Sequence, residues 1–173
     1  MQLLIDWYLP ALSSEQHTQL QTIFDLLSDN ALSTDQVFVH RDYHARNLML
    51  LANNELGVID FQDAVIGSNT YDLVSLLKDA YFELESSKVQ ALLAYFHKQA
   101  KLTISFNDFE KQFDLMGLQR HLKILGIFKR LSIRDGKHQY LADIPLVAKY
   151  ALAIANKYPE LKSLSSILTL ANQ

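Results

Sequence analysis

The sequence predicts a mainly α-helical fold that carries one small β-hairpin, an α+β arrangement in which helices predominate. Apolar residues recur through most of the chain at the three- and four-residue spacing of amphipathic helices. Two short apolar runs flank Asn53 and Asn54, residues that tolerate the positive φ of a tight turn. Apolar residues make up 49% of the 173 residues, enough for a sizeable core, so we expect a single domain over residues 1–173.

Composition excludes several classes of function. The 16 Lys and Arg residues are balanced by 19 Asp and Glu residues, and no basic run favours nucleic acid. Cysteine is absent, which rules out disulfides and thiolate zinc sites. No apolar stretch reaches the length of about 20 residues that a transmembrane helix needs, and the start lacks a signal-peptide pattern. We therefore expect a cytoplasmic protein that binds neither nucleic acid nor membrane.

The N-terminal part predicts two helical segments. Residues 1–12 are apolar and aromatic with an interruption at Pro10, which indicates a short segment that docks on the main body. Ser13 or Ser14 is placed to cap the next helix, because a serine hydroxyl accepts from the free N–H groups of a first turn. Apolar spacing carries this helix to about Ser28.

The middle of the chain predicts strands. Val37–Val39 is a short β-prone run, and the runs Leu48–Leu51 and Leu56–Ile59 are expected to pair as the hairpin. Centring the turn on the two asparagines sets Asn47 directly opposite Asp60. Partners of this kind project from one face of the ladder with Cβ atoms about 5 Å apart.

After the hairpin the sequence predicts a loop over Ala64–Asn69 and then helices. The first helix is expected from a cap at Asn69 or Thr70 through Tyr81, and the second from Ser86 or Ser87 through Phe96. The third is expected from Phe109 to about Ile133, with Asn107 or Asp108 as its cap. Two more are expected, from about Pro145 to Asn156 and from Pro159 to Leu170.

Oxygen-bearing residues gather around the predicted hairpin. His40-Arg41-Asp42 is followed after four residues by Asn47, and Asp60 ends the second apolar run. Phosphoryl transfer needs an acceptor hydroxyl positioned by a carboxylate and Mg²⁺ ions held by hard oxygen ligands. Asp42 can serve the first need, and Asn47 and Asp60 the second, while His40 is expected to support the loop. Each residue alone has an ordinary explanation as a cap or turn; together, in this order, they favour catalysis.

The run HRDYHARN…GVIDFQDAVIGSNTYDL resembles the aminoglycoside phosphotransferase-like kinases, which share the protein-kinase-like fold. The resemblance implies that Asp42 is the catalytic base and that Asn47 and Asp60 bind Mg²⁺. It also implies that Asp72 braces the catalytic loop, although a carboxylate in a first helical turn is equally explained by the helix dipole. Gln62 is a departure, because many relatives have glycine after the Asp-Phe pair.

The same run together with FEKQFDLMGLQRHLKILGIFKRL (Phe109–Leu131) is similar to the bacterial N-acetylmuramate/N-acetylglucosamine anomeric kinases of cell-wall recycling. This resemblance implies ATP-dependent phosphorylation of the anomeric hydroxyl of an amino sugar. Three alternatives stay open. One is an aminoglycoside antibiotic phosphotransferase, and another is a non-catalytic kinase-like lobe. The third is a kinase for choline- or homoserine-type acceptors, because the same catalytic loop serves several small hydroxyl acceptors.

The glycines limit what this chain can do. They stand at positions 57, 67, 117, 126 and 136, too far apart for a glycine-rich phosphate loop. By the resemblance, the chain corresponds to the C-terminal catalytic and substrate lobe, with the N-terminal β lobe absent. ATP would be bound mostly by that missing lobe. We therefore expect the chain alone to be inactive, and its exposed lobe interface to favour self-association.

Overall fold

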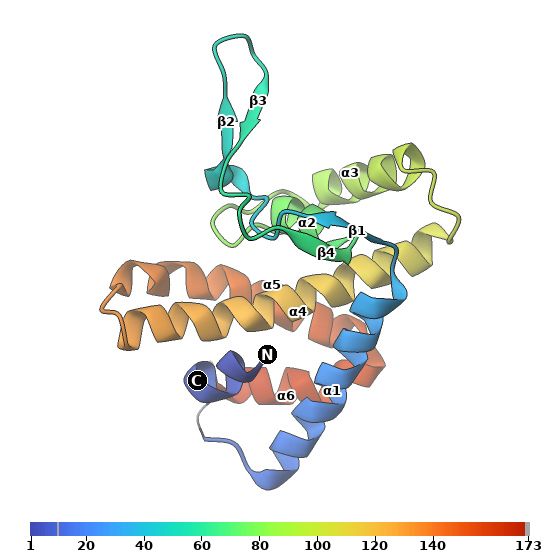
Figure 1. The fold of residues 1–173 in the computed structure, drawn as a ribbon. Coiled ribbons are helices and arrows are strands. Elements are labelled where there is room, and N and C mark those ends of the chain that lie inside the picture. Colours follow the sequence, from blue (N-terminus) through green and yellow to red (C-terminus); the bar gives the residue numbers. More distant parts are fainter. Residues whose placement is uncertain (10, 172–173) are drawn as a thin grey trace. The chain divides into compact units, whose positions relative to one another are not determined.

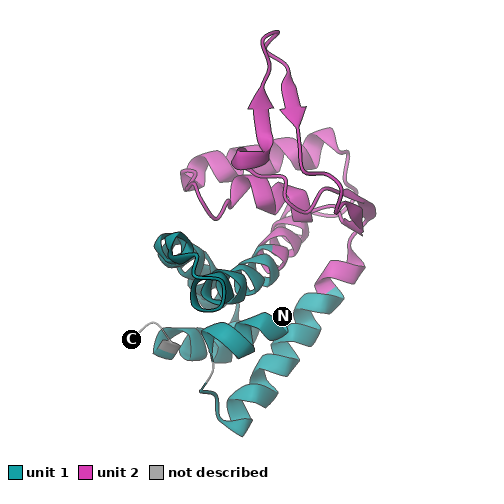
Figure 2. Ribbon diagram, turned by 60° about the vertical axis from the view of Figure 1, so that its left-hand side comes forward, with its two compact units in different colours: residues 1–29, 117–173 teal, residues 30–116 magenta. Residues whose placement is uncertain are grey.

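A computed structural model describes residues 1–9 and 11–171 of the chain (Figure 1). Pro10, the predicted interruption of the first segment, lies outside the described residues. The chain divides into two compact units, residues 1–29 with 117–173 and residues 30–116 (Figure 2). Both boundaries fall inside helices, α1 (Ser14–Ser33) and α4 (Phe106–Ile133). The expectation of a single domain stays a prediction.

The first unit, residues 1–29 and 117–173, is helical. Besides its parts of α1 and α4 it contains a π-helical turn η1 (Leu4–Tyr8), α5 (Ile144–Lys157), α6 (Lys162–Ala171) and two 3₁₀ turns, η3 (His138–Asp143) and η4 (Pro159–Leu161). Its core is built from fully buried leucines at positions 4, 20, 27, 118, 122, 125, 161, 164 and 168. The helical spacing of these leucines is the pattern that predicted the helices.

Two local features fix this unit's N-terminal segments. Ser13 Oγ accepts from the N–H of Gln16, whose side-chain oxygen accepts from the N–H of Ser13, so the two residues form a capping box. Gly126 faces the backbone of Leu3, and a Cβ at Gly126 would lie 2.4 Å from the Leu3 carbonyl. The first segment can therefore cross α4 only where that helix has no side chain.

The second unit, residues 30–116, combines helices with two short antiparallel strand pairs. It contains α2 (Tyr71–Leu77), α3 (Ser86–Gln99), the first part of α4 and the strands β1 (Gln36–Val39), β2 (Leu48–Leu50), β3 (Leu56–Val58) and β4 (Val65–Ser68). Its buried core consists of Val74, Leu77, Val89, Leu93, Phe109, Phe113 and Met116. Helices and small antiparallel strand pairs together confirm the predicted fold class.

The prediction of a loop over Ala64–Asn69 is wrong for Val65–Ser68, which form β4. β4 pairs antiparallel with β1, with Val65 opposite Val39 and Gly67 opposite Val37. β-branched residues favour such pairing, and β1 would otherwise leave its backbone groups without a ladder.

The predicted register of the hairpin is wrong by one residue. The structure pairs Leu48 with Val58 and Leu50 with Leu56, so the ladder does not set Asn47 opposite Asp60. The connection has three residues rather than two: the Leu51 N–H donates to the Glu55 carbonyl. Asn54 takes the left-handed conformation, with φ 61°, that closes such a loop.

Helix ends differ from the expected positions for identifiable reasons. α1 continues past Ser28, where the Asn30 amide donates to the Gln112 carbonyl and ties the added turn to α4. α4 begins at Phe106 and is capped by Ser105, whose hydroxyl accepts from the Asp108 N–H, rather than by Asn107 or Asp108.

α2 ends at Leu77 instead of Tyr81. The Asp79 carboxylate accepts the Tyr81 N–H at 3.0 Å, a local bond of the kind that competes with helical backbone pairing. Among the described residues, no helix is both long enough and apolar enough to cross a membrane.

Candidate active site

The predicted catalytic loop, His40–Asn47, lies in the second unit between β1 and β2. Arg41 takes a left-handed conformation, with φ 75°, and so turns the chain sharply after β1. A 3₁₀ turn over Ala45–Asn47 then leads into β2. The His44 N–H donates to the Asp42 carbonyl at 3.0 Å, and the Asn47 N–H donates to the His44 carbonyl at 2.9 Å. These bonds make the loop a compact pair of turns.

Asp72, in the first turn of α2, binds the beginning of this loop. Its two carboxylate oxygens accept the backbone N–H groups of His40 at 2.6 Å and Arg41 at 3.0 Å. A left-handed backbone conformation at a non-glycine residue costs about 1–3 kcal/mol of conformational free energy. The two hydrogen bonds to Asp72 hold Arg41 in that conformation. This is the geometry expected of a bracing carboxylate.

His40 links the loop to the hairpin. Its side chain is only 5% exposed, and its Nε2 bonds to the Ile59 carbonyl at 3.0 Å. Ile59 directly precedes Asp60, so the imidazole ties the start of the loop to the backbone beside the second predicted metal ligand. The position suits the supporting role expected for His40, which stays a prediction.

Asn47 and Asp60 lie close together although the ladder does not pair them. The Asn47 amide donates to the Asp42 carbonyl at 2.9 Å, and its Nδ2 lies 3.4 Å from a carboxylate oxygen of Asp60. The Ile59 N–H donates to the Asn47 carbonyl and ends the ladder. Asp60, with φ 68°, then turns its carboxylate back toward Asn47.

The carboxylate of Asp60 has a second amide neighbour. Gln62 donates from its side-chain nitrogen to the other oxygen of Asp60 at 2.6 Å. Gln62 stood out in the sequence as a departure from the family pattern, but its contact with Asp60 was not foreseen. Residues two apart in a tight turn can meet in this way, so the spacing was the available signal.

Asn47 and Asp60 suit Mg²⁺ as a donor set. Each side chain carries a hard oxygen, the donor type that Mg²⁺ prefers, and the 3.4 Å contact of the Asn47 nitrogen with Asp60 places the two side chains next to each other. Within the described residues, no group of three or more His, Cys, Asp or Glu side chains gathers as a metal site. Phosphates and water would have to complete the coordination.

A second carboxylate, Asp79, also reaches the catalytic loop and was missed from the sequence. Its side chain is 4% exposed and accepts the Ala45 N–H at 3.2 Å. Helical spacing from Asp72 does not mark it, because α2 ends at Leu77 and Asp79 lies in the turn that follows.

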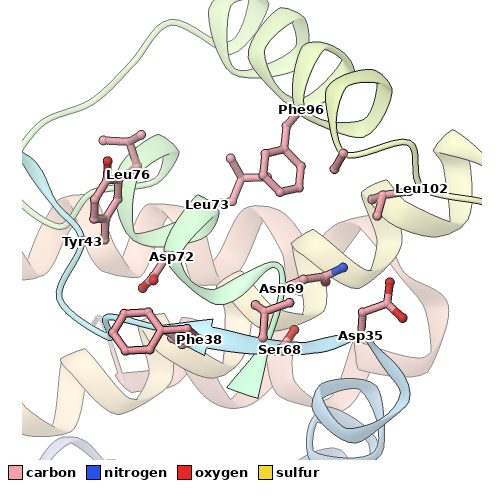
Figure 3. Close-up of a pocket in the computed structure, with 13 residues that line it drawn as sticks. Asp35, Phe38, Tyr43, Ser68, Asn69, Asp72, Leu73, Leu76, Phe96 and Leu102 are labelled. Atoms are coloured by element: carbon pink, nitrogen blue, oxygen red, sulfur yellow. The ribbon is translucent and has the colours of Figure 1, made fainter. Parts of the chain in front are cut away.

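A pocket of about 500 Å³ adjoins the loop (Figure 3). It lies among β1, α2 and α3, and Asp72 and Tyr43 form part of its wall. Most of the other lining side chains are apolar, among them Phe38, Leu73 and Phe96. The pocket therefore places an apolar space beside the carboxylate that braces the loop.

Comparison with known proteins places the chain in a family. The model of the phosphotransferase enzyme family matches residues 2–105, which include the whole catalytic loop and the hairpin. The N-acetylmuramate/N-acetylglucosamine kinase of Pseudomonas aeruginosa is 44% identical over 97% of this chain and 52% of its own length. The enzymes of that name from Pseudomonas putida (39% identical, 97% of this chain and 52% of the relative) and Neisseria meningitidis serogroup B (41%, 91% and 48%) are similar.

The chain thus spans about half the length of the curated relatives it matches. The family model covers more than half of the chain, and its matched residues contain every predicted site residue. The chain belongs to the phosphotransferase enzyme family.

Proposed function

We propose that this chain is the large lobe of an ATP-dependent kinase that phosphorylates the anomeric hydroxyl of an amino sugar, N-acetylmuramate or N-acetylglucosamine, in cell-wall recycling. The observation that carries the proposal is the meeting of Asn47 and Asp60 at 3.4 Å beside the braced loop that bears Asp42. The names of the relatives supply the substrate class. We propose the cytoplasm as the place of action.

The proposed chemistry divides among three side chains. Asp42 orients the acceptor hydroxyl and takes its proton as the new P–O bond forms. Asn47 and Asp60 hold Mg²⁺, which when bound neutralises charge on the transferred phosphoryl group. His40 and Asp72 keep the loop in place through their bonds to Ile59 and to the loop backbone.

The nucleotide is proposed to bind mainly outside this chain. The glycines of this chain are too far apart in the sequence to form a glycine-rich phosphate loop. The Pseudomonas aeruginosa relative is about twice as long as its segment that matches this chain. The hairpin supports this view, since it projects from the second unit (Figure 1) and exposes apolar side chains on both of its faces. Those side chains include Met49, Leu50, Leu51, Leu56, Val58 and Ile59. Exposed apolar patches of this kind mark surfaces that a partner covers.

The proposal is tested with two proteins. One is the 173-residue chain alone, and the other is the chain joined to the part of the Pseudomonas aeruginosa relative that lies outside the match. We expect the joined protein to consume ATP with N-acetylmuramate or N-acetylglucosamine, and the chain alone to be inactive. Turnover by the chain alone at the joined protein's rate would contradict the missing-lobe proposal.

Kanamycin provides the matched acceptor control, because it is also an amino sugar with free hydroxyls. Activity of the joined protein on kanamycin alone would favour the antibiotic phosphotransferase and overturn the proposed substrate. No turnover of any acceptor by a folded joined protein would favour the non-catalytic lobe.

A further inference from the structure

We propose that Asp79 is a positioning residue that fixes the second half of the catalytic loop and, through it, the metal ligand Asn47. This inference rests on the proposed function, in which Asn47 binds Mg²⁺. Asp72 and Asp79 then divide the loop between them: Asp72 holds the part before Asp42, and Asp79 holds the part that leads to Asn47.

The contacts of Asp79 make it a rigid anchor. One carboxylate oxygen accepts the Ala45 N–H at 3.2 Å, and the other accepts the Tyr81 N–H at 3.0 Å. The side chain is 4% exposed. A carboxylate buried to this degree keeps its partners, because moving away would leave a charge without compensation in a poorly solvated place.

The ring of Tyr81 contacts both residues that adjoin Ala45 in the sequence. The guanidinium carbon of Arg46 lies 3.5 Å from the centre of the Tyr81 ring, a cation–π contact. The imidazole of His44 meets the same ring edge-on at 5.5 Å between centroids. Three consecutive loop residues, 44–46, are therefore held by the segment 79–81 through a backbone bond and two ring contacts.

The position of Asn47 depends on these contacts of residues 79–81 with residues 44–46, which we call the clamp. It is the last residue of the 3₁₀ turn that begins at Ala45, and its N–H donates to the His44 carbonyl at 2.9 Å. We expect a shift of residues 44–46 to displace Asn47 relative to Asp60, with which it shares the proposed metal site. The clamp holds the part of the loop that follows Asp42 in the sequence, whereas Asp72 holds the part that precedes Asp42. Loss of the clamp should therefore affect metal binding more than proton transfer.

The first test uses the 173-residue chain itself, with the variants Asp79→Asn and Tyr81→Leu. Asp25→Asn is the matched control, since Asp25 is an exposed α1 carboxylate that accepts one side-chain amide. In both clamp variants we expect faster amide hydrogen exchange at residues 43–48, with α3 unchanged. We also expect Mn²⁺, used as a probe for Mg²⁺, to bind about 10-fold or more weakly, as for other outer-sphere ligand partners.

Tyr81→Leu keeps Asp79 and removes only the ring, so it carries the test if Asp79→Asn does not fold. Unchanged exchange at residues 43–48 in a folded variant would overturn the clamp. Faster exchange throughout the second unit would show a general packing role and would equally overturn it. Unchanged Mn²⁺ affinity, or no Mn²⁺ binding by the parent chain, would overturn the link to the metal.

The second test uses the joined protein described above. In Asp79→Asn we expect the Mg²⁺ concentration for half-maximal activity to rise about 10-fold, with the acceptor KM unchanged. Asp72→Asn should instead lower kcat with a smaller shift in the Mg²⁺ requirement. The same Mg²⁺ shift in both variants would contradict the division of roles. An inactive parent protein would refute the proposed function alone, because hydrogen exchange still decides the clamp.

Discussion

The side-chain nitrogen of Asn47 lies 3.4 Å from a carboxylate oxygen of Asp60, while the last paired residues of the hairpin are Leu48 and Val58. The two side chains thus meet beyond the end of the ladder. Their approach depends on the 3₁₀ turn before β2 and on the positive φ of Asp60 after β3. The proposed metal site therefore depends on these two backbone turns rather than on the pairing of β2 with β3.

Asp60→Asn should weaken metal binding while leaving the fold intact. The substitution keeps the shape of the side chain and removes the only charged oxygen of the proposed donor pair, and an uncharged amide attracts a divalent cation less strongly. We expect Mn²⁺ affinity of the chain to fall at least about 10-fold by calorimetric titration, in the range found when metal-site partners are lost. Unaltered affinity would place the metal elsewhere.

Asp42→Asn should abolish most transfer in the joined protein. A positioned general base contributes about 10²–10⁴-fold to a rate, so kcat should fall within that range. The substitution is isosteric, so the unfolding temperature of the variant should stay close to that of the parent. A kcat within a few-fold of the parent would remove Asp42 from the catalytic role.

The hairpin should make the isolated chain self-associate. Leu50 and Leu56 are cross-strand partners that are 73% and 64% exposed, and burying them between copies would remove apolar area from water. We expect the double variant Leu50→Lys, Leu56→Lys to sediment as a monomer at concentrations where the parent associates. Leu32→Lys, at a site 76% exposed on α1, is the control and should behave as the parent. A monomeric parent would contradict the prediction.

Gly126→Ala should destabilise the first unit. A Cβ there would lie 2.4 Å from the Leu3 carbonyl and 2.6 Å from the Leu4 nitrogen, both backbone atoms that cannot swing aside. Overpacking of this kind costs about 1–3 kcal/mol in the free energy of unfolding. Gly67→Ala is the matched control, because its Cβ would meet only the Val39 side chain at 3.4 Å. Equal denaturant midpoints for the two variants would refute the prediction.

Local chemistry accounts for what the sequence predicts well. The spaced leucines of the long helices are buried as predicted. Asn47 and Asp60 lie close together, in the region that also contains His40 and Asp42. Both features depend on residues that are close together in the sequence. The predicted meeting of Asn47 and Asp60 is found, yet the register offered as its reason is wrong. The sequence around Asn53 and Asn54 fits a two-residue turn and a three-residue loop almost equally well. The left-handed conformation of Asn54 closes the three-residue loop in the structure.

Long-range contacts account for what the sequence does not predict. The pairing of β4 with β1 joins residues about thirty positions apart, and short runs such as Val65–Ser68 carry too little periodicity to indicate it. Asp79 was invisible for a similar reason, since its partners Ala45 and Tyr81 are backbone groups that have no side-chain signature. The roles of His40 and Asp72 stay predictions that the geometry accommodates.

The left-handed backbones of Arg41 and Asp60 have an evolutionary consequence. Glycine adopts a positive φ without the penalty that other residues bear, so selection for stability alone would place glycine at both positions. The two positions differ in what such a change would remove. Arg41 has no part in the proposed transfer, so a glycine at 41 in a homologous gene is compatible with an active enzyme. A glycine at 60 would remove a proposed metal ligand, so a homologue that carries one is expected to have lost phosphoryl transfer.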